Sequence, residues 1–186
     1  MDAIETFLAA LERDNPEVDW NVHRDRLREE LRPDQSEPKL VLTGLPILNS
    51  DTPGMLQYIR FKTYLALENL PEEVALLPWL RTLDLSGTRL RVLPMGVGQL
   101  LNLEILDLSA TQVSLLPEWI GQLTQLRILL LARTRIQVLP NSIGYLSRLE
   151  YLSLRATHIS TLPEAMRQLL NLQWLDLTNL PLTSLP

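Results

Sequence analysis

Apolar residues recur along most of the chain with one fixed spacing. Pairs of leucine followed by proline end at Pro71, Pro94, Pro117, Pro140, Pro163 and Pro186. Successive prolines are 23 residues apart, as in 94 − 71 = 23. Inside each period an aliphatic side chain returns at five positions, which in one copy are Leu80, Leu83, Leu85, Leu90 and Leu93. This regularity, without insertion or deletion, predicts a stack of equivalent units over residues 70–186.

The Leu-x-Leu part of each unit alternates apolar and polar residues, which is typical of a β-strand. Successive side chains of a strand point to opposite faces, so Leu83 and Leu85 are expected to face inward and Thr82 outward. One unit alone cannot bury its apolar face. Stacked units can enclose it, at about 1.5–3 kcal/mol for each buried leucine. The pattern therefore predicts one strand per unit, with the strands side by side in a parallel sheet.

The segment after each Leu-Pro pair is expected to turn away from the sheet. Proline fixes φ and donates no backbone hydrogen bond, which favours a turn over a further strand. In residues 117–126 the apolar positions Ile120, Leu123 and Leu126 follow helical spacing, which predicts short helices or 3₁₀ turns. Glycines that recur once per unit are expected to permit tight packing there: Gly98, Gly121 and Gly144.

At these positions the sequence resembles the leucine-rich repeat family, whose pattern LxxLxLxxTxLxxLPxxIGxL is followed from Leu126 to Leu146. The resemblance covers residues 70–186. It implies an α/β fold, a leucine-rich-repeat solenoid shaped as a right-handed horseshoe arc. A parallel β-sheet is expected on the concave face, and short helices or 3₁₀ turns on the convex face. Repeats of 23 residues with LPxxIGxL look like those of intracellular Ras-associated scaffolds, plant intracellular relatives and some bacterial type III effectors.

Threonine occupies one column of the repeat where the family more often has asparagine: Thr88, Thr111, Thr134 and Thr157. Threonine brings one hydroxyl, whereas asparagine brings one acceptor and two donors. We expect a ladder of hydroxyls that satisfies neighbouring backbone groups, because an unpaired buried polar group costs about 1–3 kcal/mol. Leu180 interrupts the column in the last unit.

Both ends of the stack need cover, and residues 1–38 are expected to form an α-helical cap at the N-terminal end. One helix carries an apolar stripe of Ile4, Phe7, Leu8 and Leu11. Asn15 and Pro16 resemble the N-cap and first residue of a second helix, which carries Trp20, Leu27 and Leu31. An amphipathic helix for a partner or a membrane is the alternative. Residues 39–69 are interpreted as degenerate first coils before the regular repeats.

The C-terminal edge has no visible polar cap. Leu175 and Leu177 are expected on an edge coil, and an uncovered edge promotes association. The expectation is that the chain is a piece of something longer, or that a partner or a homodimer covers this edge.

Charge and composition narrow the function classes. The chain has 17 basic and 22 acidic residues and a net charge of −5, which gives no general positive field for nucleic acid. It has no cysteine, which excludes disulfides, thiolate metal sites and cysteine nucleophiles. The N-terminus has no signal-peptide pattern, and no apolar run approaches the roughly 20 residues that a bilayer requires. We expect a soluble cytoplasmic protein without nucleic-acid or membrane partners; delivery into a host cell is the alternative.

No catalytic constellation stands out. Asp84, Asp107 and Asp176 share one outward column, but Leu130 and Ser153 interrupt it, so a solvated strand face is favoured over acid–base chemistry or a cation site. No phosphate-binding glycine loop is present. The prediction is a protein that is not an enzyme and has no cofactor or metal.

Recognition of a protein is better supported. A second outward column is Thr82, Ile105, Ile128, Tyr151 and Trp174, with Leu130 beside it. Strands lie about 4.8 Å apart, so these side chains are expected to form one exposed apolar to aromatic stripe on the concave face. A cluster near the loop edge is expected from Arg133, Arg135 and Arg155. The prediction is a protein-binding site made by these apolar residues and arginines.

Three alternatives remain open. In the first, the bulky residues only shield one another and the arginines keep the surface soluble. In the second, the chain is the substrate-recognition arm of a larger bacterial effector enzyme. In the third, it is a self-associating structural solenoid.

Overall fold

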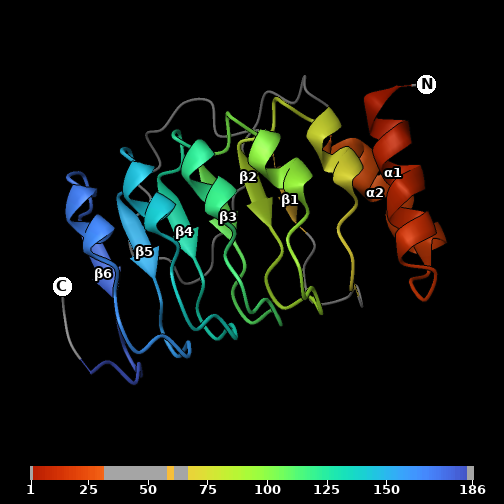
Figure 1. Cartoon of the computed structure of the whole chain (residues 1–186). Helices are drawn as coiled ribbons and strands as arrows, with labels where there is room; N and C mark the ends of the chain where they lie inside the picture. The colour runs from red at the N-terminus through yellow and green to blue at the C-terminus, as the bar shows by residue number, and fades with distance from the viewer. Residues whose placement is uncertain (1, 32–57, 61–66, 184–186) are drawn as a thin grey trace.

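The computed structural model describes residues 2–31, 58–60 and 67–183. Residues 32–38 of the predicted cap and most of the predicted degenerate coils, 39–57 and 61–66, lie outside the described residues. Figure 1 shows the strands in one row, with the helices α1 and α2 at the end beside β1 and the two termini at opposite ends of the row. This is the predicted open arc with a helical N-terminal end.

Within the described residues the strands form one six-stranded parallel sheet in chain order. Their bounds are β1 Tyr58–Arg60, β2 Thr82–Asp84, β3 Ile105–Asp107, β4 Ile128–Leu130, β5 Tyr151–Ser153 and β6 Trp174–Asp176. From β2 onward each residue pairs with its equivalent 23 positions later, as Thr82 does with Ile105. The constant repeat length therefore keeps every column of the sequence together in space.

The leucines predicted to face inward form one continuous core. Leu83, Leu106, Leu129 and Leu152, the central residues of β2 to β5, are each 0% exposed. Their counterpart in β6, Leu175, is 37% exposed because no further strand is stacked on it here. The same core continues into α1 through Phe7, Leu8 and Leu11.

A 3₁₀ helix follows each Leu-Pro pair, as predicted for the convex side. These helices are η1 Glu72–Leu76, η2 Met95–Gln99, η3 Glu118–Gln122, η4 Asn141–Tyr145 and η5 Glu164–Gln168. The proline before each has φ near −70° and an extended ψ, for example −69° and 155° at Pro117. A Cβ added at Gly121 would lie 2.6 Å from the carbonyl oxygen of Ser142. The expected tight packing of successive turns is confirmed at this glycine.

The threonine column is buried, and each hydroxyl has a backbone partner. Thr134 Oγ1 donates to the carbonyl of Leu131 at 2.8 Å, and the equivalent hydroxyls repeat this bond at 2.7–2.8 Å. The hydroxyls therefore satisfy neighbouring backbone groups, as expected. The bond stays inside one unit, so the column consists of separate bonds and not of a continuous ladder between units.

Helices α1 (Ala3–Asp14) and α2 (Trp20–Glu30) cover the first coil, and α1 packs against η1. The expectation that Asn15 caps α2 is wrong, because α2 begins at Trp20 and Asn15 follows the end of α1. The buried Asn15 side chain donates to the carbonyls of Leu11 and Asn69. Its Oδ1 accepts the backbone N–H groups of residues 68 and 69, both at 3.0 Å. Asn15 thus fastens the cap to the first coil.

Candidate functional site

The sheet brings the predicted apolar column together. Ile105 pairs with Ile128, Ile128 with Tyr151, and Tyr151 with Trp174. Because the alternate residues Leu106, Leu129 and Leu152 enter the core, this column lies on the opposite, concave face. Leu130 packs in the same small cluster, which is separate from the core.

Most of this column is less exposed than the sequence indicates. Ile105, Ile128 and Leu130 are 3%, 6% and 6% exposed and form one cluster with Tyr151 packed against it. The expectation of a fully exposed stripe is therefore wrong for the three aliphatic residues. The apolar surface that remains accessible lies at the C-terminal end of the column.

Tyr151 and Trp174 form that accessible end. Their rings are stacked, with centroids 6.3 Å apart and an angle of 4° between the planes. Trp174 is 48% exposed, and Tyr151 is partly buried. Burial, together with the negative charge of Asp176, raises the pKa of the Tyr151 hydroxyl above its usual 10.0. The pair offers a flat apolar surface with a polar group beside it.

The acidic column closes turns at the ends of the strands. Asp84 accepts hydrogen bonds from the backbone N–H and the hydroxyl of Ser86, at 3.0 and 2.6 Å. Asp107 makes the equivalent bond: it accepts the backbone N–H of Ser109, two residues further along the chain, at 2.8 Å. The expected solvated face is wrong for Asp84, which is 2% exposed.

Asp176 shares this turn arrangement and lies beside the aromatic pair. It accepts the backbone N–H of Thr178 at 3.0 Å and the hydroxyl of Ser153 at 3.3 Å. Partial burial alone would raise the pKa of Asp176. The hydrogen bonds from Thr178 and Ser153 and the charge of Arg155 together outweigh burial, so the pKa of Asp176 lies below its usual value. Asp176 therefore stays ionised at neutral pH next to Tyr151.

The predicted arginines are exposed at the edge where the strands end. Arg133 N–H donates to the carbonyl of Arg155 at 2.8 Å, so these two residues occupy neighbouring coils. Arg133 has a φ of 58°, in a column whose other members are Gly87, Ala110, Ala156 and Asn179. Any residue with a Cβ in this left-handed region carries a cost of about 1–2 kcal/mol. Arg133 shares that cost with Ala110 and Ala156, so the conformation belongs to the turn that every unit makes.

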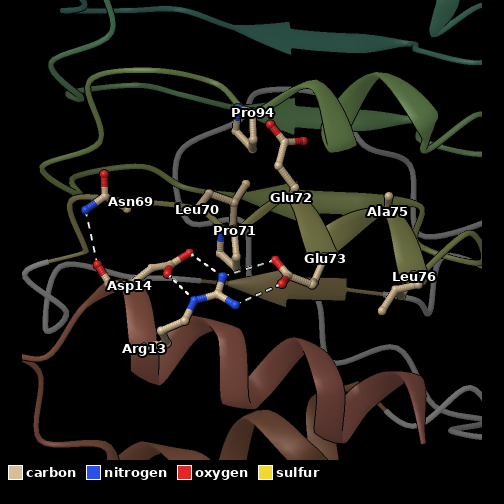
Figure 2. A pocket seen from close by; sticks show the side chains of 10 residues that line it. All are labelled: Arg13, Asp14, Asn69, Leu70, Pro71, Glu72, Glu73, Ala75, Leu76 and Pro94. Atoms are coloured by element: carbon tan, nitrogen blue, oxygen red, sulfur yellow. Dashed lines mark hydrogen bonds and ion pairs between the residues drawn. The ribbon is translucent and has the colours of Figure 1, made fainter.

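An open groove lies where the cap meets the first coil, a feature that the sequence does not signal. Figure 2 shows its lining side chains, which come from the end of α1, from residues 69–73, and from Ala75, Leu76 and Pro94. The Arg13 guanidinium donates to Asp14 at 2.6 and 3.0 Å and to Glu73 at 3.1 Å. Glu72 accepts the N–H of Met95 at 3.1 Å. These polar groups bind one another, and the groove is explained as a junction between α1 and η1.

Two other kinds of site are not found in the part of the chain that the structure describes. No group of three or more histidine, cysteine, aspartate or glutamate residues in that part of the chain is arranged to hold a metal ion. Among the described helices, none has the length and apolar character needed to cross a bilayer.

Comparison with known proteins identifies the repeats. The leucine-rich repeat family model matches residues 78–136 and 124–182. A leucine-rich repeat protein of Leptospira interrogans is 32% identical, with a TM-score of 0.54, over 70% of this chain and 39% of its own. No curated protein matches the chain.

Two further structures share the fold. The ectodomain of the Arabidopsis thaliana receptor kinase GASSHO1/SCHENGEN3, solved in complex with Casparian strip integrity factor 2, is 28% identical over 62% of this chain and 14% of its own, with a TM-score of 0.57. An internalin of Listeria monocytogenes is 23% identical over 60% of this chain and 32% of its own, with a TM-score of 0.52. This likeness supports the fold alone. The chain thus spans 14–39% of the length of these proteins. It belongs to the leucine-rich repeat family, whose fold is generally a protein-interaction module.

Proposed function

We propose that this chain is a non-catalytic module that binds a protein partner through its concave face, with Tyr151 and Trp174 at the centre of contact. The observation that carries the proposal is the stacked aromatic pair, whose outer ring is about half exposed: Trp174 has an exposed fraction of 48%. Tryptophan and tyrosine are enriched among the residues that dominate binding energy, and a stacked pair loses little side-chain freedom on binding.

Charged side chains near the aromatic pair would let the surface select a partner by its charge. Arg155 lies close enough to Asp176 for its charge to lower the pKa of that carboxyl group. Arg133 is on the neighbouring coil and is held in a backbone conformation that favours glycine. Both arginine side chains are exposed, and Arg133 has no ion-pair partner among the described residues. Arg133 and Arg155 are therefore assigned to charge recognition, with Arg135 next to them.

The buried aliphatic residues have a different role in this proposal. Ile105, Ile128 and Leu130 form the base against which Tyr151 packs, so they hold the ring in place for a partner. Their direct contact with a partner stays a prediction, as does the interpretation of the chain as the recognition arm of a larger effector enzyme.

The experiment compares two alanine variants. The intact chain is used to capture and identify partners, and affinity for a purified partner is then measured by calorimetry. Replacing both Tyr151 and Trp174 with alanine is expected to weaken binding by about 30-fold or more, which corresponds to about 2 kcal/mol. Tyr145→Ala is the matched control, because this ring is 65% exposed on η4 of the convex side. Unchanged affinity in a folded double variant would place the interface elsewhere.

Self-association is a second candidate, favoured by one observation at the C-terminal edge. Leu175 is 37% exposed, whereas its four counterparts in β2 to β5 are fully buried. A second copy could cover this edge, because an open strand has unpaired backbone groups. Sedimentation velocity over a range of concentrations tests this: a concentration-dependent dimer that is lost in Leu175→Lys supports it, and a monomer throughout contradicts it.

A further inference from the structure

The loop edge of the solenoid has a charge that differs from the rest of the chain. We define the loop edge as segments 86–93, 109–116, 132–139 and 155–162, each of which follows a strand. They contain no aspartate or glutamate, although acidic residues outnumber basic ones 22 to 17 in the whole chain. They contain five arginines and one histidine: Arg89, Arg91, Arg133, Arg135, Arg155 and His158. This edge is therefore cationic on a protein whose net charge is −5.

At the opposite end of the strands, arginine side chains form ion pairs with glutamates of the neighbouring coil. Just before β4 and β5, Arg127 binds Glu150 of the next coil through two hydrogen bonds of 2.9 and 3.0 Å. Arg81 and Glu104 form the same pair one step earlier. At the loop edge, Arg91, Arg133 and Arg135 have no ion-pair partner among the residues that the structure describes. Their charges are available to a partner.

An exposed aliphatic row runs along the same edge. It consists of Val92, Leu115 and Val138, which we call the aliphatic row, and these side chains are 74%, 67% and 64% exposed. They are equivalent positions of three successive coils and stand directly before the buried leucine of each Leu-Pro pair. The next positions of this column, Asn69 and Thr161, are polar, so the row has a defined length.

Backbone hydrogen bonds hold the row in register. The N–H of Gln112 donates to Leu90 at 2.9 Å, and the N–H of Arg135 donates to Val113 at 2.9 Å. Loops joined in this way are about 4.8 Å apart, so the row extends over about 10 Å. Three aligned and largely exposed aliphatic side chains on a folded surface mark an interaction site more often than chance.

We propose that the loop edge is a second binding surface, separate from the concave face, and that it takes an acidic amphipathic helix of a partner protein. A helix rises about 5.4 Å per turn, close to the spacing between coils, so a helix laid along the row contacts one aliphatic side chain per turn. Glutamates beside its apolar stripe then lie opposite Arg91, a loop-edge arginine that the concave-face proposal does not use. Nucleic acid does not fit as well, because the aliphatic row contributes nothing to binding a polyanion.

The probe is a synthetic peptide of leucine and glutamate with leucines at helical spacing, and its affinity for the full chain is measured by fluorescence anisotropy. Binding is expected to weaken at least fivefold in Leu115→Ser and in Arg91→Gln, and with peptides in which glutamine replaces glutamate or serine replaces leucine. Leu170→Ser is the matched control, because Leu170 is 88% exposed and follows η5, away from the row.

Two outcomes would overturn this proposal. One is a result that a single kind of contact explains. If the glutamine peptide binds as tightly as the glutamate peptide, apolar contact alone explains the binding. If heparin and anionic lipid vesicles bind equally well and Leu115→Ser loses nothing, charge alone explains it. The other is equal weakening in Leu170→Ser, since the row would then have no special part. The variant lacking Tyr151 and Trp174 is expected to bind the peptide normally. Failure of the concave-face proposal is thus measured separately from failure of this one.

Discussion

The close approach of neighbouring 3₁₀ helices gives a sharp test of how the units stack. A Cβ at Gly121 would lie 2.6 Å from the carbonyl oxygen of Ser142 and 2.9 Å from its Cβ. A Cβ at Gly98 would meet the ring of Trp119 at 3.1 Å. Both glycines have φ outside the left-handed region, so alanine is compatible with the backbone at either position. The two positions therefore differ in which neighbour has to move.

The expected costs follow from that difference. At Gly121 the obstacle is backbone, and moving it shifts η4 away from η3; overpacking of this kind costs about 1–3 kcal/mol. Alanine recovers about 0.4–1 kcal/mol by restricting the unfolded chain. We expect the Gly121→Ala variant to show a net loss of about 1–2 kcal/mol of unfolding free energy. Gly98→Ala is expected to lose under about 1 kcal/mol, because the partly exposed Trp119 ring can shift.

Urea unfolding of both variants, followed by circular dichroism, measures these costs. A weakened contact between two units also lowers the cooperativity of a repeat protein, so a broader transition is expected in Gly121→Ala. The reasoning is refuted if both variants lose the same free energy, or if Gly121→Ala unfolds like the wild type.

Two further predictions concern single side chains. Thr134→Val keeps the shape of the buried side chain but removes its hydrogen bond to Leu131, and we expect it to lose about 1 kcal/mol of unfolding free energy in urea. Thr161→Val, at an exposed position, is the control and is expected to be nearly neutral. A Thr134→Val variant as stable as the wild type would contradict this role of the hydroxyl. Hydrogen bonds from Arg28 and Arg24 outweigh desolvation and hold the pKa of Glu5 below its usual 4.5, so its contribution to stability is present above that pH and is lost as the pH falls through the lowered value. The stability difference between wild type and Glu5→Gln is therefore expected to shrink as the pH falls from neutral to below the usual 4.5, and a constant difference would contradict the assignment.

The interior of this fold could be predicted from the sequence because one pattern determines it. The Leu-x-Leu alternation assigns Leu106 and Leu129 to the core, and the constant period then places them directly opposite each other. The same arithmetic places Tyr151 beside Trp174. Stacking depends only on equal lengths and alternating faces, and both are visible in the letters of the sequence.

The accessibility of the outward residues could not be predicted in the same way. Alternation gives the face on which Ile128 lies, but the exposed fraction depends on what packs beside it, and Ile128 is 6% exposed. The exposure of the aliphatic row could not be predicted either, for the converse reason. Val92 stands beside the buried Leu93, and apolar neighbours in a Leu-Pro turn resemble core residues in sequence, although Val92 is 74% exposed. A useful signal is the composition of the two columns: the column of Val92 also contains Asn69 and Thr161, whereas the buried column of Leu93 is leucine in every unit.

Function in such a repeat is expected where a column contains a residue that its fold does not require. At the left-handed position the repeat accepts glycine, alanine and asparagine, so the long exposed side chain of Arg133 is not required by the fold. On the concave face, threonine at 82 is sufficient for the strand, so tryptophan at 174 adds a large exposed ring. At the loop edge, Thr161 fills the equivalent position in the fourth coil, so the aliphatic residues of the preceding three coils are not needed for solubility or for the core. These departures lie on two different surfaces, which is why the concave face and the loop edge are proposed as separate contacts with separate variants to test them.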